Sequence, residues 1–193
     1  MKRLQHYIQK GKVYRRSDLE YYSKSIDRDL AELTRAGKLT KLQQGLYYAP
    51  RRSKFGVVPP DERDVVNVFL KDSDFLMVSP NAYNSLGLGL TQLYNTTWVY
   101  NHKRMGELVL NGKHYLFFKK SAYPEKLTPE FLVVDLMNQL DRLAEDHSLI
   151  LEKLKQRLSE FNPKGLMEAT QKYGTGTTKR RMKVALRMSL HHE

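Results

Sequence analysis

The chain contains no cysteine, which excludes disulfide bonds and thiolate metal sites and fits a reducing compartment. It also lacks long apolar runs, and its basic N-terminal residues are not followed by the apolar segment of a secretory signal. These absences predict a cytoplasmic protein with no membrane partner. The 193 residues are enough for a sizeable core arranged in one or two domains.

The motifs of common enzyme classes are missing as well. The sequence holds no HExxH metal-binding helix, no GxSxG nucleophile elbow and no GxGxxG dinucleotide fingerprint. Its histidines do not form a set with the spacing of metal ligands. The sequence therefore predicts a protein that is not an enzyme and that has no catalytic residues, no cofactor and no metal.

What the chain does have is positive charge, concentrated toward its two ends. Its net charge is +12. Residues 1–55 contain 14 Lys and Arg against 5 Asp and Glu, residues 56–171 contain 13 against 15, and residues 172–193 contain 6 against 1. Cations segregated in this way attract a polyanion through counterion release. The charge distribution therefore favours a nucleic acid as partner.

The stretch from Ser17 to Pro50 carries the clearest structural pattern. It predicts a helix, a short turn, a second helix and a two-stranded wing. The second helix is expected to begin at residue 23 or 24 and to end at residue 36. Ile26, Leu30 and Leu33 are spaced i, i+4 and i+7, which places them on one buried side of that helix. This order is typical of a winged helix-turn-helix, whose second helix enters the major groove of DNA.

Polar and cationic side chains of this motif are candidate DNA contacts. On the side opposite the apolar stripe, Arg28 is suited to bind guanine through two hydrogen bonds, and Ser25 is suited to touch a base or a phosphate. The predicted DNA-binding residues are Lys24, Ser25, Arg28, Arg35, Lys41, Gln43, Arg15 and Arg16. The alternative interpretation is that these side chains are ordinary solvated residues.

Other charged residues qualify this prediction. Asp27 and Asp29 lie on the proposed recognition helix, where we expect them to hold an arginine in place, the alternative being that one of them accepts a hydrogen bond from cytosine. Arg51, Arg52 and Lys54 follow the motif and would widen the footprint on DNA. Residues 51–60, basic at first and then carrying a double proline, predict a linker.

The fold class that follows is α+β. We expect an N-terminal winged helix-turn-helix at residues 1–55, followed at residues 56–193 by an α+β domain with a small antiparallel sheet and a C-terminal helical bundle. An Asn111-Gly112 turn is expected to join two strands of that sheet. In the bundle, Leu132, Leu136 and Leu140 are predicted to lie on one buried seam.

A second candidate site lies near the C-terminus. The segment GTGTTKRRMK, from Gly174 to Lys183, has the glycines, hydroxyls and cations of a phosphate-binding loop, although its spacing is not that of a P-loop. The plainer interpretation is a helix capped by Thr178 and followed by basic residues. If the segment binds phosphate, Lys179, Arg180 and Arg181 are the candidate contacts to an RNA or DNA backbone.

Several segments resemble the AbiEi antitoxins of bacterial type IV toxin–antitoxin systems. Three of them are SDLEYYSKSIDRDLAELTRAGKLTKLQQGLYYAP (Ser17–Pro50), FLMVSPNAYNSLGLGLTQLYNTTWVY (Phe75–Tyr100) and GELVLNGKHYLFFKK (Gly106–Lys120). The helical end with KYGTGTTKRR (Lys172–Arg181) is similar to the same family. The first segment alone is typical of any winged helix, and its combination with the others narrows the resemblance.

The resemblance implies a protein that binds operator DNA and represses its own operon. It also implies a C-terminal domain that opposes the effect of a nucleotidyltransferase-like toxin without forming a tight complex with it. By matching positions, it implies Ser25, Arg28 and Lys41 as DNA contacts, with Lys179, Arg180 and Arg181 in the antitoxic region. The expected partners are double-stranded operator DNA and a cognate toxin.

Other functions remain open at the level of sequence. One is an RNA-binding protein whose main contact is the basic C-terminal helix, and another is a solitary winged-helix transcriptional regulator. A third is a nucleic-acid-modifying enzyme, against which the absent catalytic motifs argue.

Overall fold

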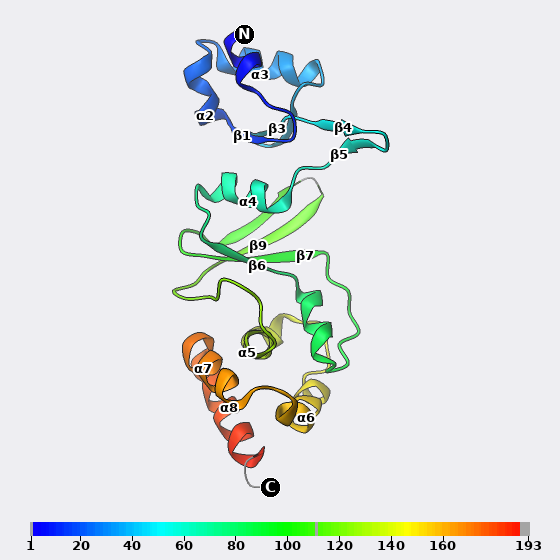
Figure 1. The fold of residues 1–193 in the computed structure, drawn as a ribbon, viewed down its shortest axis with the longest axis vertical. Coiled ribbons are helices and arrows are strands. Elements are labelled where there is room, and N and C mark those ends of the chain that lie inside the picture. Colours follow the sequence, from blue (N-terminus) through cyan, green and yellow to red (C-terminus); the bar gives the residue numbers. More distant parts are fainter. Residues whose placement is uncertain (1, 111, 190–193) are drawn as a thin grey trace. The chain divides into compact units, whose positions relative to one another are not determined.

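The computed structural model describes residues 2–110 and 112–189, which form two compact units (Figure 1). The first unit extends to Asp74 and includes Val109–Gly112, whereas the second contains Phe75–Leu108 and the chain from Lys113 onwards. Helices and strands occur in both units, so the fold class is mixed α+β. The sequence placed the domain boundary after residue 55, but residues 56–74 belong to the first compact unit.

The first unit begins with short helices beside a small antiparallel sheet and continues into a hairpin and a further helix. The three-stranded sheet has the order β1-β3-β2, and the β4–β5 pair forms a separate two-stranded sheet. The elements are α1 (Lys2–Tyr7), β1 (Val13–Arg15), α2 (Arg16–Leu19), η1 (Glu20–Tyr22, a 3-10 helix), α3 (Ile26–Arg35), β2 (Thr40–Gln43), β3 (Leu46–Tyr48), β4 (Arg51–Ser53), β5 (Gly56–Val58) and α4 (Glu62–Leu70).

The apolar stripe of α3 packs into the core of this unit. Ile26, Leu30 and Leu33 are buried, as the sequence predicted, in one cluster that also contains Leu4 and Leu19. Burial of each such side chain contributes about 1.5–3 kcal/mol. After the helix, Gly37 adopts a φ of 68°, which is the left-handed conformation expected of a residue that ends a helix.

The helix α3 begins later than the sequence predicted, at Ile26 instead of residue 23 or 24. A turn formed by two serines is the reason. The Ser23 hydroxyl accepts a hydrogen bond from the Ser25 backbone N–H at 3.0 Å and donates one to the Asp29 carboxylate at 2.9 Å. Ser23 is held in extended backbone, so Lys24 and Ser25 lie in the turn before the helix.

Residues 51–58 form the β4–β5 hairpin, although the sequence predicted a linker there. Arg51 pairs with Val58, and Arg52 pairs with Val57. The turn is closed by the Ser53 hydroxyl, which accepts from the Phe55 backbone N–H at 3.2 Å, and by the φ of 115° at Gly56. Such a φ favours glycine, which is the signal that a hairpin prediction could have used.

The hairpin is tied to the preceding sheet. The Tyr48 hydroxyl of β3 donates to the Val58 carbonyl at 2.7 Å. Further along the chain, α4 packs against β1, and its start is capped by the Asp61 carboxylate, which accepts from the Asp64 backbone N–H at 3.1 Å. These contacts explain why residues 56–74 belong with the N-terminal elements.

The second unit places a four-stranded sheet beside a group of helices, with α5 lying between the sheet and the other C-terminal helices (Figure 1). The leucines Leu132, Leu136 and Leu140 are buried in its core, as predicted. The elements are β6 (Phe75–Val78), η2 (Pro80–Leu86), β7 (Thr96–Asn101), β8 (Gly106–Leu110), β9 (Lys113–Lys119), α5 (Pro129–Gln139), η3 (Leu140–Arg142), α6 (His147–Arg157), η4 (Leu158–Glu160), α7 (Pro163–Tyr173) and α8 (Gly176–Ser189).

The sheet of the second unit is mixed, so the prediction of an antiparallel sheet was wrong in part. Its order is β6-β7-β9-β8. The β6–β7 pair is antiparallel, but β7 and β9 are parallel, with Thr96 opposite His114. The strand β9 returns between β7 and β8 instead of adding at the edge, and local sequence patterns do not reveal this order. The predicted turn at Asn111-Gly112 includes a residue outside the described range.

A buried carboxylate joins the sheet to α5. Asp135 is 1% exposed, and its carboxylate accepts hydrogen bonds from the hydroxyls of Tyr83 and Tyr100, each at 2.7 Å. The Gln139 amide in turn donates to the Tyr100 hydroxyl at 3.2 Å. Burial raises the pKa of Asp135 to about 6, although the hydrogen bonds from Tyr100 and Tyr83 act in the opposite direction.

The raised pKa of Asp135 predicts a pH-dependent stability. The folded state binds this proton more tightly than the unfolded chain, so the contribution is fully present below the ordinary pKa of 3.8 and is lost as the pH rises through about 6. The loss amounts to about 3 kcal/mol. We expect the free energy of unfolding of the wild type, relative to Asp135→Asn, to fall by this amount between about pH 4 and pH 7, as measured by urea unfolding. A pH-independent difference would contradict the assignment.

Candidate nucleic-acid interface

The exposed side of α3 carries two arginines on either side of a small residue. Arg28, Ala31, Glu32 and Arg35 are all exposed and are spaced i, i+3, i+4 and i+7, so they lie along one side of the helix, with one carboxylate beside the two arginines. The buried stripe of the same helix lies opposite them. A small side chain between two long cations lets the helix backbone approach a partner closely while the guanidinium groups reach to either side.

The carboxylate of Asp27 on the same helix is paired with Arg16. The guanidinium of Arg16 donates two hydrogen bonds to it, from Nε to Oδ1 at 2.6 Å and from Nη2 to Oδ2 at 2.7 Å, and a further one to Glu20. These hydrogen bonds lower the pKa of Asp27. The sequence predicted that an aspartate would hold an arginine, and the arginine so held is Arg16.

This pairing changes the assignment of Arg16 from a predicted DNA contact to a positioning residue. Its guanidinium is occupied by two carboxylates, so it links α2 and η1 to the start of α3. It also neutralises Asp27, which would otherwise repel a phosphate from the exposed side of the helix. Local patterns contain no sign of the pairing, because the two residues are 11 positions apart.

A hollow at the N-terminal end of α3 brings together three of the predicted site residues. Lys24, Ser25 and Arg28 line it with Arg3. Two acidic residues, Asp29 and Glu32, line it as well, but Asp29 is 3% exposed and hydrogen-bonded to Ser23. Lys24 and Ser25 reach this hollow from the turn before the helix and not from the helix itself.

The predicted wing residues lie on the strand β2 and its turn. Lys41 is exposed, and its Nζ donates to the Gln44 side-chain oxygen at 2.8 Å. Gln43 is half-buried, because the register between β2 and β3 shifts between Lys41 and Gln43 and leaves Gln43 opposite Leu46. Lys41 is therefore better placed than Gln43 to meet a partner in solvent.

Arg15 is directed away from the other predicted contacts. Its side chain is half-buried, and its guanidinium donates a hydrogen bond to the Val68 carbonyl of α4. Its role as a predicted DNA contact does not fit this position, because the group is engaged by the backbone of the neighbouring helix. Like Arg16, it joins elements of the first unit to one another.

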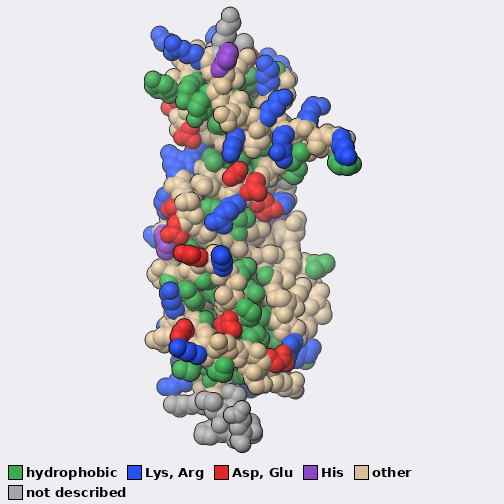
Figure 2. All heavy atoms as spheres, viewed as in Figure 1, with side chains coloured by type: hydrophobic (Ala, Val, Ile, Leu, Met, Phe, Trp, Pro, Cys, Tyr) green, Lys and Arg blue, Asp and Glu red, His purple; other side chains and the backbone are tan. Residues whose placement is uncertain are grey.

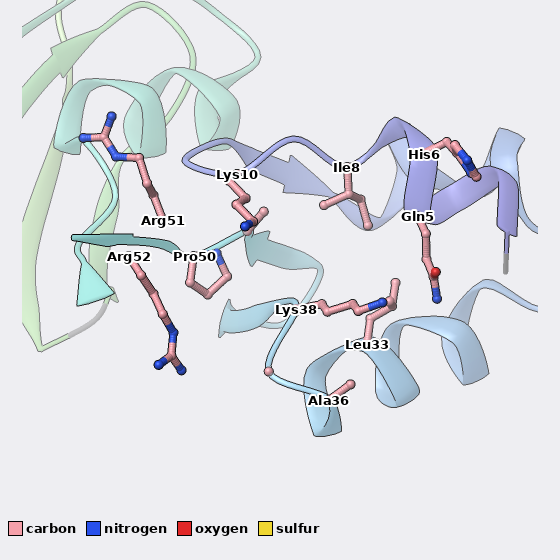
Figure 3. A pocket seen from close by; sticks show the side chains of 12 residues that line it. Gln5, His6, Ile8, Lys10, Leu33, Ala36, Lys38, Pro50, Arg51 and Arg52 are labelled. Carbon is pink, nitrogen blue, oxygen red and sulfur yellow. The ribbon is translucent and has the colours of Figure 1, made fainter. Parts of the chain in front are cut away.

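A second hollow lies at the other end of α3 (Figure 3). Leu33, Ala36 and Gly37 contribute its helix side, and the start of β4 contributes the side across from them. The cations among the residues that line it are Lys10, Lys38, Arg51 and Arg52, and none of these lining residues is acidic. Lys10 and Lys38 did not figure among the predicted contacts, because each comes from a connection outside α3.

Cations of the first unit are also prominent on its surface. On the face shown in Figure 2, Lys and Arg side chains gather over this unit and on the projecting β4–β5 hairpin. The hairpin carries Arg51, Arg52 and Lys54, and all three are exposed. These residues, predicted to widen the footprint, extend the positive surface beyond α3.

The C-terminal segment is built as a capped helix. Helix α8 begins at Gly176, and not after Thr178 as predicted. The Thr175 hydroxyl accepts from the Thr178 backbone N–H at 3.2 Å, and the Thr175 carbonyl accepts from the Lys179 N–H at 2.8 Å. A Cβ on Gly174 would come within 2.5 Å of the Thr170 carbonyl, so close packing requires this glycine.

This cap uses the backbone N–H of Thr178, which is one of the groups that a phosphate cradle at the start of the helix would need. Of the candidate contacts, Lys179 is half-buried, whereas Arg180 and Arg181 are exposed. Among the described residues, no group of three or more His, Cys, Asp or Glu is placed to hold a metal ion. Within residues 2–110 and 112–189, every helix is too short or too polar to cross a membrane.

The fold has a counterpart among solved structures. It is similar to the RV2827C protein from Mycobacterium tuberculosis, with a TM-score of 0.56 and 14% sequence identity over 91% of this chain and 71% of that chain. At this level of identity the likeness concerns the fold alone. No protein-family model matches the chain, and no curated protein matches it.

The Arg16–Asp27 pair gives a direct test of how the exposed side of α3 is neutralised. In Arg16→Gln, we expect the pKa of Asp27 to rise toward its ordinary value, because its main hydrogen-bond donor is lost. In the wild type, the stabilisation from this pair is present above the ordinary pKa and is lost as the pH falls through the lowered one. An NMR titration of the Asp27 carboxyl measures the shift, and Arg35→Gln is the matched control. Equal titration of Asp27 in all three proteins would contradict the pairing.

Proposed function

We propose that the first unit is a winged helix that binds duplex DNA with α3 in the major groove. The support is the order of its elements: α1, β1, α2, α3, β2 and β3, with β1 and β2 on either side of β3. A helix of 10 residues is about 15 Å long, which suits the major groove. The turn between β2 and β3, where Gly45 has a φ of 75°, serves as the wing.

One observation carries the proposal. The exposed side of α3 presents Arg28 and Arg35 with Ala31 and one carboxylate, Glu32, between them in sequence, while the nearby carboxylate of Asp27 is neutralised by Arg16. Arg28, near the N-terminal end of the helix, is assigned to base edges, because recognition helices read bases with their first turns. Lys24, Arg35 and Lys41 are assigned to phosphates.

We further propose that the chain is a sequence-specific autorepressor and an antitoxin of the AbiEi kind. The resemblance of Ser17–Pro50, Phe75–Tyr100 and Gly106–Lys120 to that family supports it. These segments supply the recognition helix with its wing in the first unit and the strands β6, β7 and β9 with part of β8 in the second. DNA binding and opposition to the toxin would then reside in different units of one chain.

The assignment of Arg28 predicts a loss of specificity. In Arg28→Ala, we expect binding to a duplex selected from a random library by the wild type to weaken by about 1–3 kcal/mol, with little change on unrelated duplexes. In Lys41→Ala, a phosphate contact is lost, so affinity should fall about equally on all duplexes and the salt dependence should become shallower. Fluorescence anisotropy at several salt concentrations distinguishes the two. Equal affinity of the wild type and Arg28→Ala for the selected duplex would remove the base-reading role.

The antitoxic function predicts a separation of activities. If the neighbouring open reading frame encodes a nucleotidyltransferase-like toxin, its expression should arrest growth, and this chain should restore growth. Arg28→Ala should still restore it, because the variant affects the DNA-binding unit. The triple variant Lys179→Ala, Arg180→Ala, Arg181→Ala should not restore growth if the basic start of α8 acts in antitoxicity. Failure of the wild type to protect cells would refute the antitoxin.

RNA binding is the alternative function, and a further binding measurement distinguishes it from DNA binding. The exposed cations Arg180, Arg181 and Lys183 of α8 are the surface that would serve it. Filter binding that compares duplex DNA with an RNA of the size of tRNA separates the two functions. Preference for RNA, lost in the α8 triple variant and kept in Arg28→Ala, would favour the alternative.

A further inference from the structure

We propose that the β4–β5 hairpin and the hollow beside it form a second contact to the phosphate backbone of the same duplex. This inference rests on the proposed binding of DNA by α3. It assigns a role to a surface outside the recognition helix and the wing, and it concerns affinity and not base reading. The residues that carry it are Lys38, Arg52 and Lys54.

The hollow joins the recognition helix to the hairpin. Its lining includes Leu33 and Ala36 from the last turns of α3 and Arg52 from β4, the first strand of the hairpin (Figure 3). Lys38 stands just beyond the end of the helix, and Lys10 enters from the connection between α1 and β1. A strand of DNA passing the C-terminal end of α3 would therefore meet a surface that presents cations and no carboxylates among its lining residues.

The hairpin extends this surface into solvent. All of Arg51, Arg52, Ser53, Lys54 and Phe55 are exposed. Arg51 and Arg52 both line the hollow, but their side chains point to opposite sides of β4, as neighbours on a strand do (Figure 3). We assign the side of Arg52 to the DNA backbone. Lys54 lies at the turn, where its Nζ is 4.9 Å from the centroid of the Phe55 ring.

The shape of this surface favours a polymer over a small anion. A site for a free phosphate converges several donors on one point, whereas these cations are spread from a helix end along a projecting ribbon. A nucleic acid backbone offers charges at regular spacing and can meet them in succession. The ring of Phe55, which is 88% exposed, adds an apolar tip that can pack against sugar edges without reading sequence.

The test uses the full chain and two DNA probes. One probe is a short duplex selected from a random library by the wild type, and the other is the same duplex lengthened on both sides with arbitrary sequence. In Lys38→Gln, Arg52→Gln, Lys54→Gln, we expect affinity for the long probe to fall on the order of 10- to 100-fold, and the slope of log affinity against log salt to flatten by about 2–3. The ratio of selected to unrelated sequence should not change, because phosphate contacts do not read bases.

Two controls are matched in charge. Lys126→Gln, Lys155→Gln, Lys164→Gln removes the same charge from exposed positions of the second unit and should leave the salt slope unchanged. Within the hairpin, Arg51→Gln should cost less affinity than Arg52→Gln. The single variant Lys54→Gln, at the exposed turn, preserves a test if the triple variant fails to fold.

The outcomes separate this inference from the function on which it rests. If Arg28→Ala loses specificity but the hairpin variants bind with the affinity and salt slope of the wild type, the hairpin contact is refuted and α3 recognition stands. If the second-unit control weakens binding as much as the hairpin triple, the effect is one of net charge and the inference fails. If the wild type prefers no duplex sequence, the proposed function fails and this inference fails with it.

Discussion

The burial of one apolar stripe decides how the rest of the first unit is arranged. Ile26, Leu30 and Leu33 occupy one side of α3, so the helix has only one rotation in which all three leave solvent. Together they contribute about 5–9 kcal/mol, whereas an exposed ion pair contributes about 0.2–1 kcal/mol. The stripe therefore fixes the orientation of the helix, and the charges on its other side follow from that orientation. Arg28 and Arg35 face solvent because the burial of Ile26, Leu30 and Leu33 turns the opposite side of the helix outward.

The charged residues of the first unit contribute less to stability, and their main effect is on the charge of its surface. The bidentate pair between Arg16 and Asp27 contributes little to stability at an exposed site, but it neutralises a negative charge beside the exposed side of α3 that we propose to face DNA. Arg15 is also engaged within the protein, because its guanidinium donates to the Val68 carbonyl and so joins β1 to α4. The arginines of the motif thus divide into those that position the helix and those left at its exposed side. A simple count of cations in the sequence would have assigned all of them to DNA.

Local patterns in the sequence predicted those parts of the fold that depend on neighbouring residues. The period of the stripe in α3 and the leucine seam of the second unit both belong to this class. Several of the parts that sequence reasoning missed depend on distant residues. Asp27 meets an arginine 11 positions away, and Asp135 meets tyrosines 35 and 52 positions away. The parallel pairing of β7 with β9 is likewise a property of strand order, which no segment carries by itself.

The hairpin at residues 51–58 shows why amino-acid composition led to the wrong prediction of a linker at this place. Arginines followed by two prolines are common in linkers, but here Pro59 and Pro60 follow a completed hairpin. The chain has a short ribbon where a flexible basic linker was predicted. A ribbon holds its cations in fixed positions, so under the proposed function less conformational entropy would be lost when they meet phosphates. In that proposal the fixed surface beside α3 would supply affinity and the helix would supply discrimination, because the two contributions come from different residues.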